Sequence, residues 1–203
     1  MFGLAVLVVF GVYLLLSFLV VRWTIGYARK NGKSAKRWGW GAAFIMYSLV
    51  FWDFIPTVAA HQYYCAKDSG FWVYKTLDQW KAENPGVMEK LPAPSSAGSP
   101  IKYEPFDDGH GKRNIYLLNG RFNWIVSQQD IPILLPIIRT EQVVKDIQKN
   151  EVLARYVDFG SGHAVLERAM PLRFWLENTG CIGSESNYGN FLLFKRIFEG
   201  VEK

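Results

Sequence analysis

Apolar residues dominate two long segments at the start of the chain, residues 1–21 and 38–60, whereas the remainder mixes apolar and polar positions over shorter distances. A helix crosses the hydrocarbon core of a bilayer with about 20 mostly apolar residues, and both segments reach that length. The pattern predicts a transmembrane hairpin over residues 1–61, with helices over 1–21 and 38–60 and a connecting loop over 22–37.

The connecting loop is basic and contains no acidic residue. Lys and Arg collect on the cytoplasmic side of membrane proteins, so we expect this loop in the cytoplasm and both chain ends on the opposite side. Residues 1–5 contain no basic residue and residues 19–23 make a poor cleavage site, so we expect a retained helix and not a signal peptide. The residues that determine this topology are Arg22, Arg29, Lys30, Lys33, Lys36 and Arg37.

Small residues on the second segment favour close helix packing. Gly39 and Ala43 are four residues apart and therefore lie on one helical face. Such pairs let the backbones of two transmembrane helices approach closely. We expect packing against the first helix, with a helix of another protein as the alternative.

Residues 62–203 carry the signals of a separate folded domain. Thr76 followed by Gln79 makes a capping box at the start of a helix, and Asn119-Gly120 is a strong turn signal between two strands. The predicted strands cover residues 71–74, 114–118, 121–127 and 152–159, and the predicted helices cover 77–83, 171–178 and 191–198, the last with Phe191, Phe194 and Phe198 on one face.

Three further segments complete the predicted domain. Residues 141–148 pair with 152–159 as a second hairpin in the interpretation we favour, with a helix capped by Thr140 as the alternative. Pro132 and Pro136 restrict residues 131–139 to an edge strand or an irregular segment. Residues 91–111 are rich in Pro, Gly and Ser and predict a flexible loop. The sequence therefore predicts a small extracytoplasmic α+β domain with mainly antiparallel strands.

Charge distribution excludes a nucleic-acid partner. The net charge is +5, with 23 basic and 18 acidic residues. The basic loop holds six of the former and Asp53 is the one acidic residue before residue 62, so the predicted domain carries 17 of each sign and is neutral. A nucleic-acid-binding domain concentrates basic charge on the surface that meets the phosphates. The basic character here is a signal of membrane topology.

Both cysteines of the chain, Cys65 and Cys181, fall in the predicted extracytoplasmic domain. Disulfides persist in oxidising compartments, and two cysteines allow one pairing. We expect a Cys65–Cys181 disulfide, with two free buried thiols as the alternative.

Asp53 is an acidic residue inside a hydrophobic segment, where charged groups are costly and often functional. Thr57 and His61 follow at steps of four, so the three residues would line one polar helical face within the membrane. We favour a position near the outer membrane interface, where Asp53 forms hydrogen bonds. The alternative is a path for protons or ions.

Other candidate chemistry is weak. The chain contains no nucleotide-binding fingerprint and no convergent catalytic set, and we read Ser161 beside His163 as part of a turn. We expect no metal, because the candidate ligands lack paired spacing and a disulfide would consume both thiols. That candidate set is His61, Cys65, His110, His163 and Cys181.

These observations favour a protein of a bacterial inner membrane that presents a periplasmic domain to another membrane or periplasmic protein. We expect a non-catalytic role without a cofactor, with the lipid bilayer as the other partner. The first alternative is an accessory subunit of a membrane transport or redox complex that uses Asp53 and His61, and the second is a membrane-tethered hydrolase.

Overall fold

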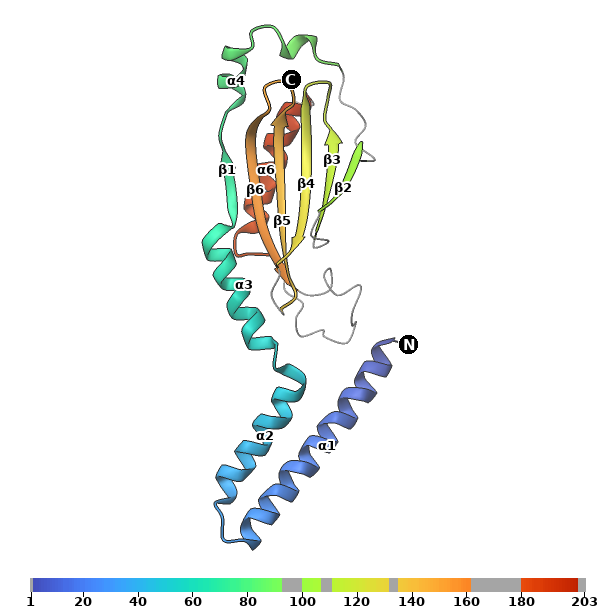
Figure 1. The fold of residues 1–203 in the computed structure, drawn as a ribbon, viewed down its shortest axis with the longest axis vertical. Coiled ribbons are helices and arrows are strands. Elements are labelled where there is room, and N and C mark those ends of the chain that lie inside the picture. The colour runs from blue at the N-terminus through green and yellow to red at the C-terminus, as the bar shows by residue number, and fades with distance from the viewer. Residues whose placement is uncertain (1, 93–99, 107–110, 132–134, 162–179, 201–203) are drawn as a thin grey trace. The chain divides into compact units, whose positions relative to one another are not determined.

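The computed structural model describes residues 2–92, 100–106, 111–131, 135–161 and 180–200 (Figure 1). The chain divides into two compact units, Met1–Pro56 and Thr57–Lys203. The predicted helix over 171–178 and most of the predicted loop over 91–111 lie outside the described residues, as do His110 and His163.

The first unit is helical. Helix α1 (Phe2–Lys30) contains a stretch, Leu7–Lys30, that is long and apolar enough to cross a membrane, with a mean hydropathy of 2.1. Helix α2 (Ala35–Phe51) reaches the same criterion only together with the following helix α3 (Phe54–Asp68), as a bent pair. The helices extend into the segment expected to be loop, so the basic residues lie at helix ends and in a short turn.

The break between α2 and α3 at Trp52-Asp53 has a clear covalent cause. Pro56 has no backbone N–H to donate to the carbonyl of Trp52, and its ring would clash with that carbonyl in a continuous helix. Pro56 instead lies in the first turn of α3, where a missing N–H is tolerated. Helix α3 then continues to Asp68, beyond residue 60 where the second predicted helix ends.

Helices α1 and α2 pack closely at Gly39. Gly39 is buried, and a Cβ added there would lie 3.0 Å from Cγ1 and Cδ1 of Ile25 on α1. The Tyr13 hydroxyl donates a hydrogen bond to the carbonyl of Met46. Near the turn, the ammonium group of Lys33 lies 4.6 Å from the ring centroid of Trp38. The close contact between α2 and α1 therefore depends on the absence of a side chain at Gly39.

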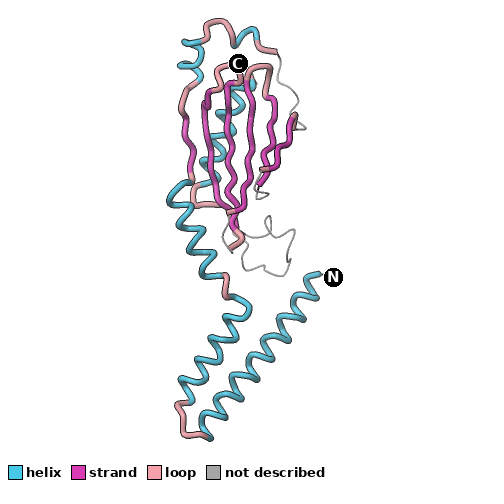
Figure 2. The backbone as a smooth tube through the Cα atoms, in the orientation of Figure 1, coloured by secondary structure: helices cyan, strands magenta, loops and turns pink. Residues whose placement is uncertain are grey.

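The second unit is built on a six-stranded sheet in the order β1-β6-β5-β4-β3-β2, with every neighbouring pair antiparallel (Figures 1 and 2). The α+β class with antiparallel strands is confirmed. The strands are β1 (Gly70–Val73), β2 (Lys102–Pro105), β3 (Gly111–Leu117), β4 (Phe122–Asp130), β5 (Ile137–Asp146) and β6 (Glu151–Ser161). Besides α3, the described residues of this unit form α4 (Leu77–Glu83), the 3-10 turn η1 (Met88–Lys90) and α6 (Ser184–Glu199).

Helix α6 covers one face of the sheet and lies behind it in Figure 1. Its apolar stripe is the one that the sequence predicts, because Phe191, Phe194 and Phe198 recur at steps of three and four and are all buried. They pack on sheet and loop residues that include Phe122 and Val144. The core of the domain thus lies between this helix and this sheet face.

The local predictions for the sheet are largely confirmed. Thr76 and Gln79 form both hydrogen bonds of the capping box at the start of α4, and the turn after β3 contains Asn119-Gly120 as expected. The prediction for residues 131–139 is wrong in part, since Ile137–Arg139 belong to β5, which pairs with β4 and β6 and is not an edge strand. Pro136 directly precedes β5, so its missing N–H breaks no bond of the sheet.

A buried ion pair joins α4 to the sheet. The Nε of Arg121 lies 2.9 Å from one carboxylate oxygen of Asp146, and Trp80 Nε1 donates to the other oxygen at 2.9 Å. The guanidinium also donates to Asn84 and Gln148. Burial acts to raise the pKa of Asp146, but the hydrogen bonds from Arg121 and Trp80 outweigh it and hold the pKa below its ordinary value. The pair therefore contributes stability above the ordinary carboxylate pKa and loses it as the pH falls through the lowered value.

Arg121→Met should destabilise the domain strongly, because it leaves the Asp146 carboxylate buried without its charged partner. Breaking a buried pair in this way costs about 3–5 kcal/mol. Arg113→Met is the matched control, since Arg113 is exposed and lies 3.8 Å from Glu104; such a surface pair contributes under about 1 kcal/mol. Urea unfolding of the detergent-solubilised chain, followed by tryptophan fluorescence, measures both. Equal unfolding midpoints for the two variants would contradict this account of the ion pair.

Gly39→Val should weaken the packing of α2 on α1, because the added methyl groups must displace Ile25. Gly41→Val is the control, since a Cβ at Gly41 meets no atom within 4 Å. Thermal melting of the helical signal in mild detergent should show a lower midpoint for Gly39→Val than for Gly41→Val. The same midpoint for both would mean that close approach at Gly39 does not hold the two helices together.

Candidate functional site

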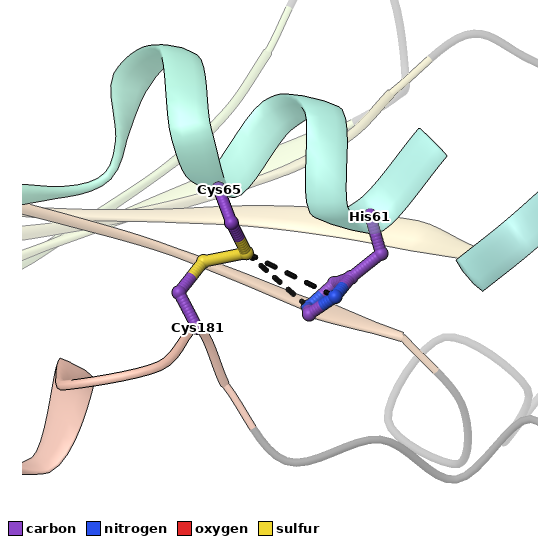
Figure 3. A group of neighbouring side chains, drawn as sticks. All are labelled: His61, Cys65 and Cys181. Atoms are coloured by element: carbon purple, nitrogen blue, oxygen red, sulfur yellow. Dashed lines mark hydrogen bonds between the residues drawn. A yellow bond between two sulfur atoms is a disulfide. The ribbon is translucent and has the colours of Figure 1, made fainter. Parts of the chain in front are cut away.

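A disulfide and a histidine form the most distinctive side-chain cluster of the second unit (Figure 3). His61 and Cys65 are one helical turn apart on α3, and Cys181 lies just before α6. Cys65 and Cys181 are bonded, with their Cα atoms 5.5 Å apart and a separation of 116 positions in sequence. The predicted pairing is confirmed, and it ties α3 to the segment that leads into α6.

The ring of His61 is held by the sheet. Its Nε2 lies 2.9 Å from the carbonyl oxygen of Phe159 on β6, and the side chain is buried. A carbonyl oxygen only accepts hydrogen bonds, so Nε2 is the donor in this contact. Nδ1 and Nε2 lie 3.8 and 3.6 Å from Cys65 Sγ. The sheet thereby holds the ring in place with Nε2 as the donor.

The two cysteines differ in exposure. Both pack in an apolar cluster with Ile137, Val157 and Phe159, but Cys65 is partly exposed on α3, whereas Cys181 is 5% exposed. The ring of Tyr64 stacks on Phe159 at a centroid distance of 5.5 Å. The carboxylate of Asp158 accepts a hydrogen bond from the backbone N–H of Cys181 at 2.9 Å. Solvent therefore has better access to Cys65 than to Cys181.

This cluster places three potential metal-ligating atoms, from His61, Cys65 and Cys181, within 4.8 Å of one another. In the oxidised protein both sulfurs are bonded to each other and neither is a thiolate, which is the form that binds metals. The cluster as it stands is thus a disulfide with an adjacent imidazole.

The other predicted polar residues are placed as follows. Asp53 lies in the break between α2 and α3 and is buried, and Thr57 is buried on α3, one turn before His61. The hydroxyl oxygen of Thr57 has no hydrogen-bond partner within the part of the chain that the structure describes. The intramembrane polar face formed by Asp53, Thr57 and His61 stays a prediction.

A second candidate site is the sheet face opposite α6, which we call the open face. No described helix lies over its central strands in the view of Figure 1; α3 residues cover the end near Val157 and Phe159. Strand alternation defines the open face, since Trp124 and Tyr156 point toward α6 and their neighbours point away. Sequence reasoning missed this surface because it depends on strand register.

Two cross-strand rows make up the open face. The register places Lys102, Ile115, Ile125, Val143, Arg155 and Trp72 in one row across all six strands. The adjacent row contains Glu104, Arg113, Ser127 and Glu141. The first row is apolar at its centre, where its three aliphatic side chains are partly exposed, and cationic on both sides. Hence an apolar strip is set within charged residues.

The charged residues of the open face are held in fixed positions by ion pairs. Glu141 binds Arg139 at 2.7 Å and Arg155 at 2.6 Å, and the guanidinium of Arg155 lies 5.5 Å from the ring centroid of Trp72. Burial acts to raise the pKa of Glu141, but the two arginines outweigh it and hold the pKa below its ordinary value. The carboxylate is therefore ionised at neutral pH and the network is preorganised.

Comparisons with protein-family models, curated proteins and solved structures found no match to this chain. The functional argument thus rests on the disulfide cluster and the open face.

Proposed function

We propose that this chain is a membrane-anchored, non-catalytic docking protein of a bacterial inner membrane. In this proposal, α1 crosses the bilayer once and the α2–α3 pair crosses it back. The sheet domain then lies in the periplasm, where it binds another membrane or periplasmic protein through the open face.

Three features support this topology. The segment Leu7–Lys30 has the length and hydropathy of a span. Basic residues at the ends of α1 and α2 and in the turn between them favour the cytoplasm for that end. The Cys65–Cys181 disulfide favours an oxidising compartment for the sheet domain. A single orientation satisfies all three.

The observation that carries the docking role is the composition of the open face. Protein interfaces combine an apolar centre with a polar rim, and Trp and Arg are frequent anchors. Ile115, Ile125 and Val143 supply the centre here, and Arg155 and Trp72 supply anchors at its side. The ion pairs of Glu141 fix Arg155 before binding, which lowers the entropy lost on association.

Ile125→Lys should abolish partner binding, because it places a charge at the centre of the apolar strip. Ile147→Lys is the matched control, since Ile147 is 43% exposed in the turn between β5 and β6, outside the open face. Purification of the full-length chain from its native membrane in mild detergent, with mass spectrometry of co-purified proteins, measures the effect. We expect a stoichiometric partner with the wild type and Ile147→Lys, and at least a tenfold loss with Ile125→Lys, about 1.4 kcal/mol or more.

Absence of any stoichiometric partner for the wild type would contradict the docking role. If a partner is retained by Ile125→Lys and function is lost in Asp53→Asn, the alternative of a membrane transport or redox subunit would replace it.

A further inference from the structure

We propose that the Cys65–Cys181 disulfide is a redox-active centre that exchanges electrons with a dithiol, with His61 as the proton acceptor and donor beside Cys65. This inference concerns a different part of the domain from the open face and does not rest on the docking role.

The unequal exposure of the two cysteines assigns a role to each sulfur. Thiol–disulfide exchange begins when a thiolate attacks one sulfur of a disulfide, so access to that sulfur is needed. Both cysteines pack in the same apolar cluster, but Cys65 is partly exposed, whereas Cys181 is buried. An incoming thiolate therefore attacks Cys65 Sγ and displaces Cys181, which makes Cys65 the exchange cysteine and Cys181 the resolving cysteine.

His61 supplies the proton transfer that this exchange requires. A thiol must lose its proton before it attacks, and an adjacent imidazole is an effective acceptor near neutral pH. Because Nε2 donates to the carbonyl of Phe159, Nδ1 is the nitrogen that takes up the proton, and Nδ1 and Nε2 lie 3.8 and 3.6 Å from Cys65 Sγ.

The reaction balances with a dithiol as reductant. One thiol of the dithiol gives its proton to His61, and its sulfur forms a mixed disulfide with Cys65 while the Cys65–Cys181 bond breaks. The electron pair of that bond leaves on Cys181, which takes the proton. The second thiolate of the dithiol then attacks the mixed disulfide and releases Cys65, which is protonated. The dithiol loses two electrons and two protons as it becomes a disulfide, and the protein gains two thiols.

Other ionisable groups around the centre do not replace His61. Asp158 on β6 faces Cys181 through the backbone N–H of that residue. Asp68, one turn after Cys65, is paired with Arg139 of β5 at 3.4 Å. Tyr64 stacks on Phe159, and Lys67 lies over the ring of Tyr63 on α3 at 5.6 Å. Within the described residues, the His61 ring is the imidazole in contact with the Cys65 sulfur.

Reduction of the full-length, detergent-solubilised chain by dithiothreitol at pH 7 tests the proposal, with free thiols counted by maleimide labelling. Two variants carry the test. His61→Asn keeps an N–H that can donate to the Phe159 carbonyl but cannot accept a proton at neutral pH, and Tyr63→Phe is the control on the exposed side of α3. Circular dichroism establishes that each variant retains its fold.

We expect the wild type and Tyr63→Phe to be reduced while folded, at a rate proportional to dithiothreitol and unchanged by low urea. His61→Asn should react at least about tenfold more slowly, since general base catalysis contributes about 100-fold or more in favourable cases. Either of two results would overturn the proposal: reduction that occurs only when urea unfolds the domain, or a rate for His61→Asn equal to that of the wild type. Neither result bears on binding at the open face.

Discussion

The contact between α3 and the sheet is the constraint on which the second unit depends. Helix α3 is the first element of that unit, and its side chains reach the sheet domain through one apolar cluster around Phe159. The Cys65–Cys181 bond closes a loop of 116 residues there, and loop-closure arguments assign such a bond about 4–5 kcal/mol. The hydrogen bond from His61 to the carbonyl of Phe159 is directional, so it orients α3 relative to β6. A disulfide, an apolar cluster and a hydrogen bond thus hold α3 against β5 and β6 in the same place.

The open face is the face of the sheet opposite α6. A six-stranded antiparallel sheet has two faces, and α6 with its three buried phenylalanines covers one of them. The same alternation that directs Trp124 toward α6 directs Ile125 away from it. Ion pairs among Arg139, Glu141 and Arg155 then satisfy the polar groups beside the apolar strip. Within the part of the chain that the structure describes, no helix lies over the central strands of this face in the view of Figure 1.

Sequence reasoning succeeded where a structure is determined by neighbours in the chain. The capping box of α4, the turn at Asn119-Gly120 and the aromatic stripe of α6 are local signals, and the structure contains all three. Sequence reasoning failed where the structure is determined by pairing between residues that are distant in the chain. The central position of β5 depends on pairing with both β4 and β6, and the proline before the strand gave a misleading signal because it lies outside the hydrogen-bonded register.

The candidate site shows the same division. Two cysteines in one predicted domain allowed the disulfide to be predicted, whereas the approach of His61 to Cys65 required α3 to continue as a helix beyond residue 61. The spacing of four between His61 and Cys65 was visible in the sequence, but the carbonyl that fixes the ring comes from a strand 98 residues away. The open face was inaccessible to sequence reasoning, since its rows combine one residue from each strand.

The redox centre and the open face are continuous through the strands that they share. Arg139 pairs with Asp68 on α3 and with Glu141 on the open face. Val157 is adjacent to Glu141 in the register and belongs to the apolar cluster around the disulfide. A protein bound over Glu141 and Arg155 would therefore lie beside the helix that carries Cys65. Because Cys181 is buried and Cys65 is partly exposed, a thiol presented by such a partner would meet the sulfur next to His61 first.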